Sequence, residues 1–256
     1  MKIEKIKKTS SNTYQIVLED KSKIKTYDEV ILKNNLLYKK ELDQEEINTI
    51  LKENEYYSVY SDSIKYLTKK VHSKQEYINY LKKYNLVEKR KKDLIVKMEE
   101  LNLLNDDYYI KAYIYDKFHL TSDGILKIRN DLLSQNLSKE KIDDELSKID
   151  QEEINDKLEK LVMKKIKSTK GSNYQIRQKV ISSLITLGYE KNDIEKYLID
   201  IDDSKSLEKD FNKVYLSLSR KEKDMDTLYF KIKQKLYQKG YNSEDINEII
   251  NKKRNY

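Results

Sequence analysis

Hydrophobic side chains recur along this chain with a period of 52 residues, and this recurrence predicts how most of the chain folds. Four apolar columns and one column of asparagine and glycine occur in three successive copies. The aligned positions are Ile128, Val180 and Ile232; Leu132, Leu184 and Leu236; Asn136, Gly188 and Gly240; Ile142, Ile194 and Ile246; and Leu146, Leu198 and Ile250. A weaker copy lies 51 residues upstream, at Tyr77, Leu81 and Asn85. Self-similarity at such a period is typical of repeat architectures built from small supersecondary units.

Within each copy the apolar residues follow the i, i+3, i+4, i+7 spacing of a helix with one buried face, as at Ile125, Ile128 and Leu132. From residue 58 onward this spacing predicts three helices per repeat. The predicted helices are 58–70, 74–84 and 87–101; 107–118, 124–135 and 139–149; 152–168, 174–187 and 193–199; and 206–219, 226–239 and 244–255. The column of Asn85, Asn136, Gly188 and Gly240 is expected to end the second helix of each repeat in the left-handed backbone conformation.

The first residues follow a different pattern, because apolar and polar side chains alternate there with the two-residue period of a strand. Strands are predicted at 1–7, 13–19 and 23–26, and helices at 27–34 and 44–53. The predicted fold class is therefore mainly α: tandem three-helix repeats forming an elongated, curved solenoid-like array, with a small N-terminal strand-rich segment. The predicted domains are the N-terminal segment 1–55 and helical repeats at 56–105, 106–150, 151–199 and 200–256.

The residue types argue against an enzyme. The chain has no cysteine, so disulfides and thiolate metal sites are excluded and a cytoplasmic location is expected. His72 and His119 are the only histidines, and neither has a second ligand at metal-binding spacing. No glycine-rich phosphate loop and no nucleophile motif occurs. We expect no catalytic residue, no metal, no cofactor and no membrane-spanning segment, since no apolar run approaches the roughly 18 to 20 residues that a membrane helix needs.

Charge favours a binding role only weakly. The 52 basic and 45 acidic residues give a net charge of +7, and the many lysines reflect AT-rich codons as readily as a nucleic-acid footprint. The excess is densest in residues 56–105. Cations cluster at the end of the first helix and in the second helix of the repeats, where Lys127, Lys179 and Lys231 again lie 52 residues apart. The candidate contact residues are Lys69, Lys70, Lys74, Lys117, Lys127, Arg129, Lys164, Lys165, Lys167, Arg177 and Lys179.

Two interpretations of these cations stay open from the residues alone. Cations at a helix C-terminus complement the helix dipole, which is a structural role. Stacked repeats would also align them in a row suited to an extended anionic partner. The 22 tyrosines carry a similar ambiguity. Tyr66, Tyr80 and Tyr84 lie near lysines and could stack on bases, but core packing with the hydroxyl at the edge is the better expectation.

The order of these features resembles the RecX family of bacterial recombination regulators over almost the full length. The opening segments MKIEKIKK and TYQIVLED look like the strand-rich start of its longer members. IKYLTKKVHSKQEYINYLKKYNL, residues 64–86, is similar to the first-repeat pattern of the family. In residues 101–146 the second-repeat pattern is matched at Asn105, Asp106, Tyr109, Ala112, Gly124, Ile128 and Leu132. The turn Lys69-Lys70-Val71-His72 departs from the more arginine-rich family pattern, and Asn85 and Asn136 stand where glycine is common.

The resemblance implies a non-enzymatic modulator of RecA in recombination, DNA repair and the SOS response. Its implied partner is the RecA nucleoprotein filament, bound within the filament groove so that RecA activity is inhibited or the filament disassembles. Direct contact with single- or double-stranded DNA is also implied. We expect a monomer, with its contacts in the first and third repeats. A general nucleic-acid-binding helical repeat protein that acts without RecA is the alternative, and a purely structural scaffold is a third.

Overall fold

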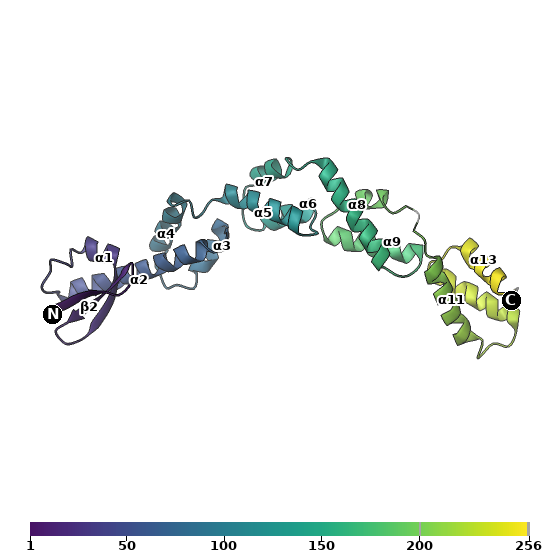
Figure 1. Ribbon diagram of the computed structural model, residues 1–256, viewed down its shortest axis with the longest axis horizontal. Helices are drawn as coiled ribbons and strands as arrows, with labels where there is room; N and C mark the ends of the chain where they lie inside the picture. Colours follow the sequence, from purple (N-terminus) through teal and green to yellow (C-terminus); the bar gives the residue numbers. More distant parts are fainter. Residues whose placement is uncertain (200, 255–256) are drawn as a thin grey trace. The chain divides into compact units, whose positions relative to one another are not determined.

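The computed structural model of the chain describes residues 1–199 and 201–254. Over these residues the chain is mainly helical, with thirteen α-helices and one three-stranded sheet (Figure 1). It divides into two compact units, Met1–Ala112 and Tyr113–Tyr256. The predicted class of three-helix repeats with a small N-terminal strand-rich segment is confirmed.

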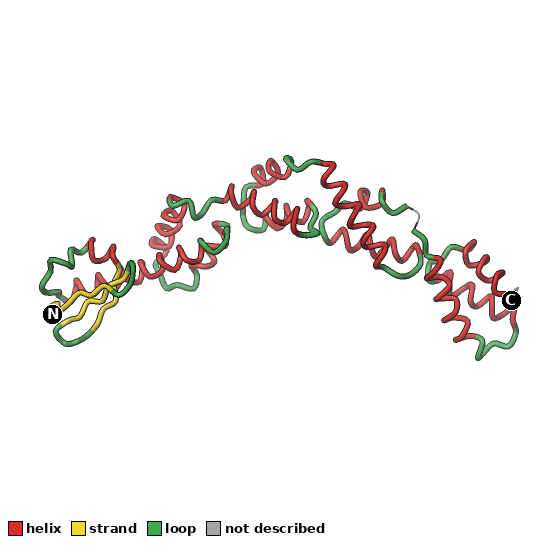
Figure 2. The backbone as a smooth tube through the Cα atoms, in the orientation of Figure 1, coloured by secondary structure: helices red, strands yellow, loops and turns green. Residues whose placement is uncertain are grey.

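The N-terminal sheet consists of β1 (Ile3–Lys8), β2 (Thr13–Leu18) and β3 (Lys23–Tyr27), antiparallel and in that order (Figure 2). The three predicted strands are thus confirmed to within about two residues. The alternation places Ile16 and Leu18 of β2 on the buried side, where they pack with α1 (Asp28–Lys33) in one hydrophobic core.

A single helix, α2 (Gln44–Leu67), follows the sheet and runs for 24 residues. The prediction of separate helices at 44–53 and 58–70 was wrong, and the proposed boundary between residues 55 and 56 lies inside α2. No glycine or proline interrupts this stretch, so the helix has no reason to stop. An Asp43–Glu46 capping box begins the helix.

The first repeat is completed by α3 (Lys74–Leu81) and α4 (Glu88–Glu100). The Ser73 side chain caps α3 together with Glu76. The expected left-handed residue at Asn85 is not found, because α3 already ends at Leu81 and a turn follows it. Asn102 instead adopts this conformation, with a φ of 54°, directly after α4.

The remaining helices match the predicted ones to within about three residues. They are α5 (Asp106–Leu120), α6 (Ile125–Leu133) and α7 (Lys139–Leu146); α8 (Gln151–Ser168), α9 (Asn173–Thr186) and α10 (Lys191–Lys196); and α11 (Ser204–Leu218), α12 (Met225–Gln238) and α13 (Ser243–Arg254). Asn255, the predicted end of the last helix, lies outside the described residues. The side chains of the four apolar columns are all buried. Asn136, Gly188 and Gly240 have φ values of 56°, 86° and 84°, so their predicted left-handed conformation is confirmed.

Two junctions between repeats use the end of a second helix as a docking surface. The N–H of Gly124, at the start of α6, donates to the carbonyl of Leu187 at the end of α9, at 2.6 Å. The hydroxyl of Ser172, which caps α9, donates in the same way to the carbonyl of Lys239 at the end of α12, also at 2.6 Å. Carbonyls that have no partner inside their own helix are thereby satisfied by donors at the start of another helix.

Candidate functional site

The candidate cations separate into two groups, according to whether an acidic side chain neutralises them. Five of the eleven form ion pairs with described residues. They are Lys70, Lys74, Lys117, Lys127 and Arg129. The other six form no ion pair with any described residue; they are Lys69, Lys164, Lys165, Lys167, Arg177 and Lys179.

Lys127 and Lys117 both face Asp123, a buried carboxylate with an exposed fraction of 5%. The Nζ atom of Lys127 lies 2.5 Å from Asp123 Oδ1, and that of Lys117 lies 3.8 Å from Oδ2. Burial by itself raises the pKa of Asp123, but the hydrogen bond from Lys127 and the two lysine charges outweigh it, so the pKa lies below its ordinary value. Asp123 does not cap α6, since its carboxylate is occupied by these lysines.

The other paired cations bridge neighbouring elements. Arg129 binds Asp143 of α7 through two hydrogen bonds, of 2.6 and 3.0 Å, which is the bidentate geometry that favours arginine. Lys74 Nζ lies 2.6 Å from Glu99 Oε1 on α4, and Lys70 lies 3.9 Å from Glu76. These side chains hold the fold together, so the structure gives them a local role that their sequence spacing did not reveal.

Most of the unneutralised cations lie close together in the chain, between residues 164 and 179. We call the set Lys164, Lys165, Lys167, Lys170, Arg177 and Lys179 the third-repeat basic cluster. It occupies the end of α8, the connecting loop and the start of α9, two helices that share one hydrophobic core. Lys164, Lys167, Lys170 and Lys179 are exposed, and Lys179 Nζ donates to the carbonyl of Lys170 at 3.3 Å. Lys170 was missed in the sequence because it lies in a loop outside the 52-residue columns.

Arg177 faces a different environment from the lysines of the cluster. Its Nε atom donates to Asn173 Oδ1 at 2.8 Å, and it lines a cavity of about 630 Å³ together with Tyr174, Asp203 and Asp245. The two carboxylates make this cavity a poor site for an anion. The cations best placed to meet an anionic partner in the third repeat are therefore the lysines.

The tyrosines of the first repeat form a closed stack. Tyr80 lies on Tyr66 with ring centroids 3.9 Å apart, and Lys83 Nζ lies 3.9 Å from the Tyr80 centroid. Tyr66 stacks on His72, at 4.0 Å. His72 lies in the loop before α3 and is buried. Because both ring neighbours of Tyr80 and of Tyr66 are already present, these rings support the core and have no free face for a base.

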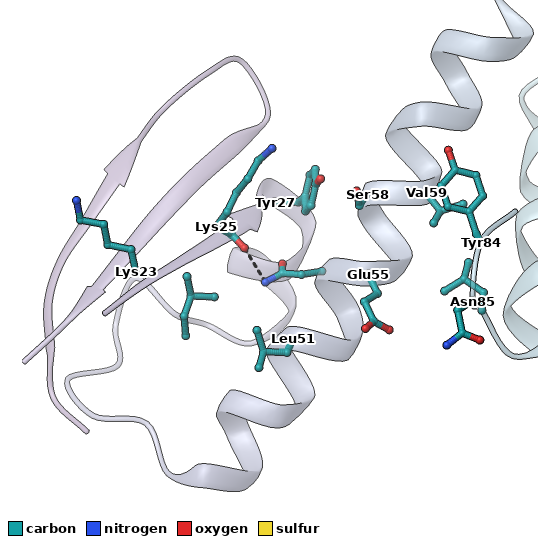
Figure 3. A pocket seen from close by; sticks show the side chains of 12 residues that line it. Lys23, Lys25, Tyr27, Leu51, Glu55, Ser58, Val59, Tyr84 and Asn85 are labelled. Carbon is teal, nitrogen blue, oxygen red and sulfur yellow. Dashed lines mark hydrogen bonds between the residues drawn. The ribbon is translucent and has the colours of Figure 1, made fainter. Parts of the chain in front are cut away.

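An open cavity of about 720 Å³ lies beside β3 and α2 in the first unit (Figure 3). Val59, Tyr84 and Leu51 line it, and Asn54 donates across it to the carbonyl of Lys25 at 2.8 Å. No nucleophile and base meet in its lining. Among the described residues, no group of three histidine, cysteine or acidic side chains could hold a metal, and no helix is long and apolar enough to cross a bilayer.

The fold and the exposed lysines together define the class of protein: a helical-repeat protein whose candidate residues for binding a partner are exposed cations. No protein-family model matches the chain. It is 26% identical to "Regulatory protein RecX" of Halalkalibacterium halodurans over 257 residues, covering 96% of this chain and 97% of the relative. The protein of that name from Bacillus cereus is 28% identical and covers 99% of this chain and 97% of its own length. The one from Bacillus cytotoxicus is 29% identical and covers 88% of this chain and 85% of its own length.

Solved structures agree on the fold. The crystal structure of a regulatory protein RecX superimposes with a TM-score of 0.62 and 22% identity, covering 78% of this chain and 99% of that one. A RecX from Lactobacillus salivarius gives a TM-score of 0.50 and 20% identity, covering 56% and 94%. The relatives named above confirm the predicted resemblance to the RecX family over nearly the whole chain.

Proposed function

We propose that this chain is a regulatory protein that binds RecA filaments and inhibits their recombinase and ATPase activity. The observation that carries the proposal is the similarity to proteins named "Regulatory protein RecX" over 96% and 99% of the chain. The succession of helical repeats along the chain supports it, because such repeats recognise partners through surfaces rather than through a catalytic pocket.

The contact with the filament is assigned to the lysines of the third-repeat basic cluster and to Lys69. These lysines carry charge that no acidic side chain of the described chain neutralises, so it is available to a polyanionic partner. The five candidate cations that form ion pairs are left out of this contact, because acidic side chains of the fold already neutralise them. They are Lys70, Lys74, Lys117, Lys127 and Arg129.

The deciding experiment is ATP hydrolysis by RecA on single-stranded DNA, with this protein titrated in well below the RecA concentration. Hydrolysis is expected to fall at substoichiometric ratios, because one bound regulator affects many subunits of a filament. No effect until the protein coats the DNA would contradict the proposal.

The contact surface is tested separately by the charge reversals Lys164→Glu, Lys165→Glu and Lys167→Glu in one variant. We expect weaker filament binding and a shallower dependence of binding on salt. The matched control reverses Lys205, Lys209 and Lys235, three exposed lysines of the same unit without an ion pair to a described residue. Equal losses in both variants would show a general effect of net charge and would refute the assignment.

The second candidate function is general nucleic-acid binding without RecA. It is favoured by the same unneutralised lysines, which would serve any phosphate backbone. It predicts tight binding to bare DNA with a steep salt dependence, and no effect on RecA beyond competition for the strand.

A further inference from the structure

The outward side of the N-terminal sheet carries four lysines in two rows. Lys7 of β1 and Lys25 of β3 lie on either side of Gln15 in the strand register, and Lys5 and Lys23 lie on either side of Val17. Residues paired across strands point to the same side of a sheet, and the alternate positions Ile16 and Ile24 belong to the core. The four lysines therefore share the face opposite to the core.

All four lysine side chains are exposed, and none forms an ion pair with a described residue. In Figure 3 the side chains of Lys23 and Lys25 extend away from Leu51 of α2. The acidic residues of the sheet lie elsewhere: Glu4 binds Lys21 at 2.7 Å, and Asp20 accepts hydrogen bonds from Ser22 in the turn. Glu19, just beyond the end of β2, is the acid nearest to this face along that strand.

This charge arrangement gives the outward face a positive potential that no described acidic residue on the face offsets. The lysines of β1 and β3 are not directly opposed, because β2 lies between the two strands, so they repel one another as exposed charges about 9.5 Å apart. Although the chain has 45 acidic residues, the outward positions of β1 and β3 in these two rows are all lysines. An anion bound over this face would relieve the repulsion.

The lysines are regularly spaced over this face, as phosphates are along a nucleic-acid strand. Lysines two residues apart in one strand are separated by about 6.5–7 Å, and those on β1 and β3 by about 9.5 Å. Gln15 and the half-buried Val17 lie between the lysines of β1 and those of β3, and Tyr27, the next residue on this side of β3, is buried. The described residues of the face therefore offer no exposed aromatic or large apolar anchor of the kind that dominates protein–protein interfaces. Regularly spaced cations on a face without anchors suit a uniform chain of negative charges.

We propose that the outward face of the N-terminal sheet is a nucleic-acid site, at which Lys5, Lys7, Lys23 and Lys25 contact the phosphate backbone without reading its sequence. This site is independent of the third-repeat basic cluster and goes beyond the proposed action on RecA.

The test measures binding of the full chain to a fluorescently labelled DNA duplex by anisotropy, over a series of salt concentrations. The variant replaces Lys5, Lys7, Lys23 and Lys25 by Gln, and the matched control replaces Lys40, Lys52, Lys89 and Lys92 by Gln. The control lysines are exposed, belong to the same unit and have no ion pair to a described residue. A double variant, Lys7→Gln with Lys25→Gln, guards against misfolding of the quadruple variant, and circular dichroism verifies the fold of each.

We expect the quadruple variant to lose about 3.6 from the slope of log K against log salt, and at least about tenfold in affinity at ~0.1 M salt. The double variant should lose about half of that slope, and the control should behave as the unmodified chain. The proposal is overturned if the unmodified chain does not bind DNA, or if the sheet and control variants lose affinity equally. It is equally overturned if binding to bare DNA is unchanged and only binding to a protein filament is lost, which would assign the face to an acidic protein surface.

Discussion

Gly188 and Gly124 meet backbone to backbone where the third repeat docks on the second. A Cβ atom on Gly188 would lie 2.4 Å from the backbone N of Lys127, and one on Gly124 would lie 2.6 Å from the carbonyl oxygen of Gly188. Neither position therefore has room for a side chain. The glycine column of the repeat serves two purposes, because each glycine ends a helix and lets the preceding repeat approach closely.

The two purposes can be separated by three alanine substitutions. Gly188→Ala introduces both the positive φ of 86° and the clash, and is expected to cost about 2–4 kcal/mol of unfolding free energy. Gly240→Ala has a φ of 84° but its nearest neighbours are at 3.0–3.1 Å, so about 1–2 kcal/mol is expected. Gly124→Ala has the clash without the positive φ. Urea denaturation measures all three, and equal losses for Gly188 and Gly240 would refute the close-approach argument.

Tyr189 and Tyr241 occupy the same position in successive repeats but differ in their hydroxyl groups. The Tyr241 hydroxyl donates to Asp210 at 2.9 Å, whereas the buried Tyr189 hydroxyl has no partner among the described residues. Tyr241→Phe is therefore expected to destabilise the protein by about 1.5–3 kcal/mol. Tyr189→Phe should leave stability unchanged or raise it by up to ~1 kcal/mol. The pair is compared by thermal and urea unfolding, and a loss of stability in both variants would contradict this difference.

Tyr189 also predicts a dependence on alkaline pH. Burial raises the pKa of Tyr189 to about 12, from an ordinary value of about 10. Between these values the unfolded chain releases the proton first, so the stability contributed by this group is complete below about pH 10 and is lost as the pH rises toward 12. In Tyr189→Phe, the fall in unfolding free energy between pH 9 and pH 11.5 should be smaller by about 1–2 kcal/mol. An unchanged pH profile would show that the hydroxyl reaches solvent.

Lys127 and Lys179 occupy the same position in successive repeats but have different partners, so their substitution is expected to have different effects. Lys127→Gln removes the closest cation from buried Asp123 and is expected to lower stability by about 1 kcal/mol, after screening at its partly exposed Nζ. Lys179→Gln should leave stability unchanged and weaken binding to a polyanion. Loss of binding in Lys127→Gln without loss of stability would reverse these roles.

Tyr80 is predicted to act in stability and not in nucleic-acid binding. Tyr80→Ala removes the middle of the stack between Tyr66 and Lys83 and should cost about 3–5 kcal/mol. Tyr80→Phe, which keeps the ring, is the control and should cost about 1 kcal/mol or less through its hydroxyl contacts. If Tyr80→Leu weakens DNA binding while Tyr80→Phe does not, and both variants remain folded, the ring stacks on a base and this prediction is wrong.

The repeated apolar columns predicted most of the fold, because residues such as Ile128 and Val180 are buried for a local reason, the periodicity of their own helix. The continuous α2 was not predicted, because residues 54–57 were left between two predicted helices although they include no glycine or proline to end a helix. Docking of Gly188 on Gly124 could not be predicted either, because it depends on how two helices 64 positions apart in sequence approach each other.

The candidate cations show a similar division. The Lys127–Asp123 pair lies four residues apart on one helix start and could have been expected from the sequence. Lys74–Glu99 and Arg129–Asp143 join different helices, so only the folded chain reveals that these cations are neutralised. The four lysines of the sheet were not predicted as a site, because the net charge of residues 1–55 is zero. Only the strand register shows that these lysines share one side of the sheet and that the nearby acidic residues do not.

The length of α2 has a mechanical consequence. Ile47 and Ile50 anchor it in the core under the sheet, and Val59 and Leu67 anchor it in the core of the first repeat. Its 24 residues span about 36 Å of unbroken helix, with no linker between the two cores. α2 therefore couples the two cores rigidly. A partner that binds the sheet also fixes the direction of α3 and α4, and a force on one core is transmitted to the other along the helix axis.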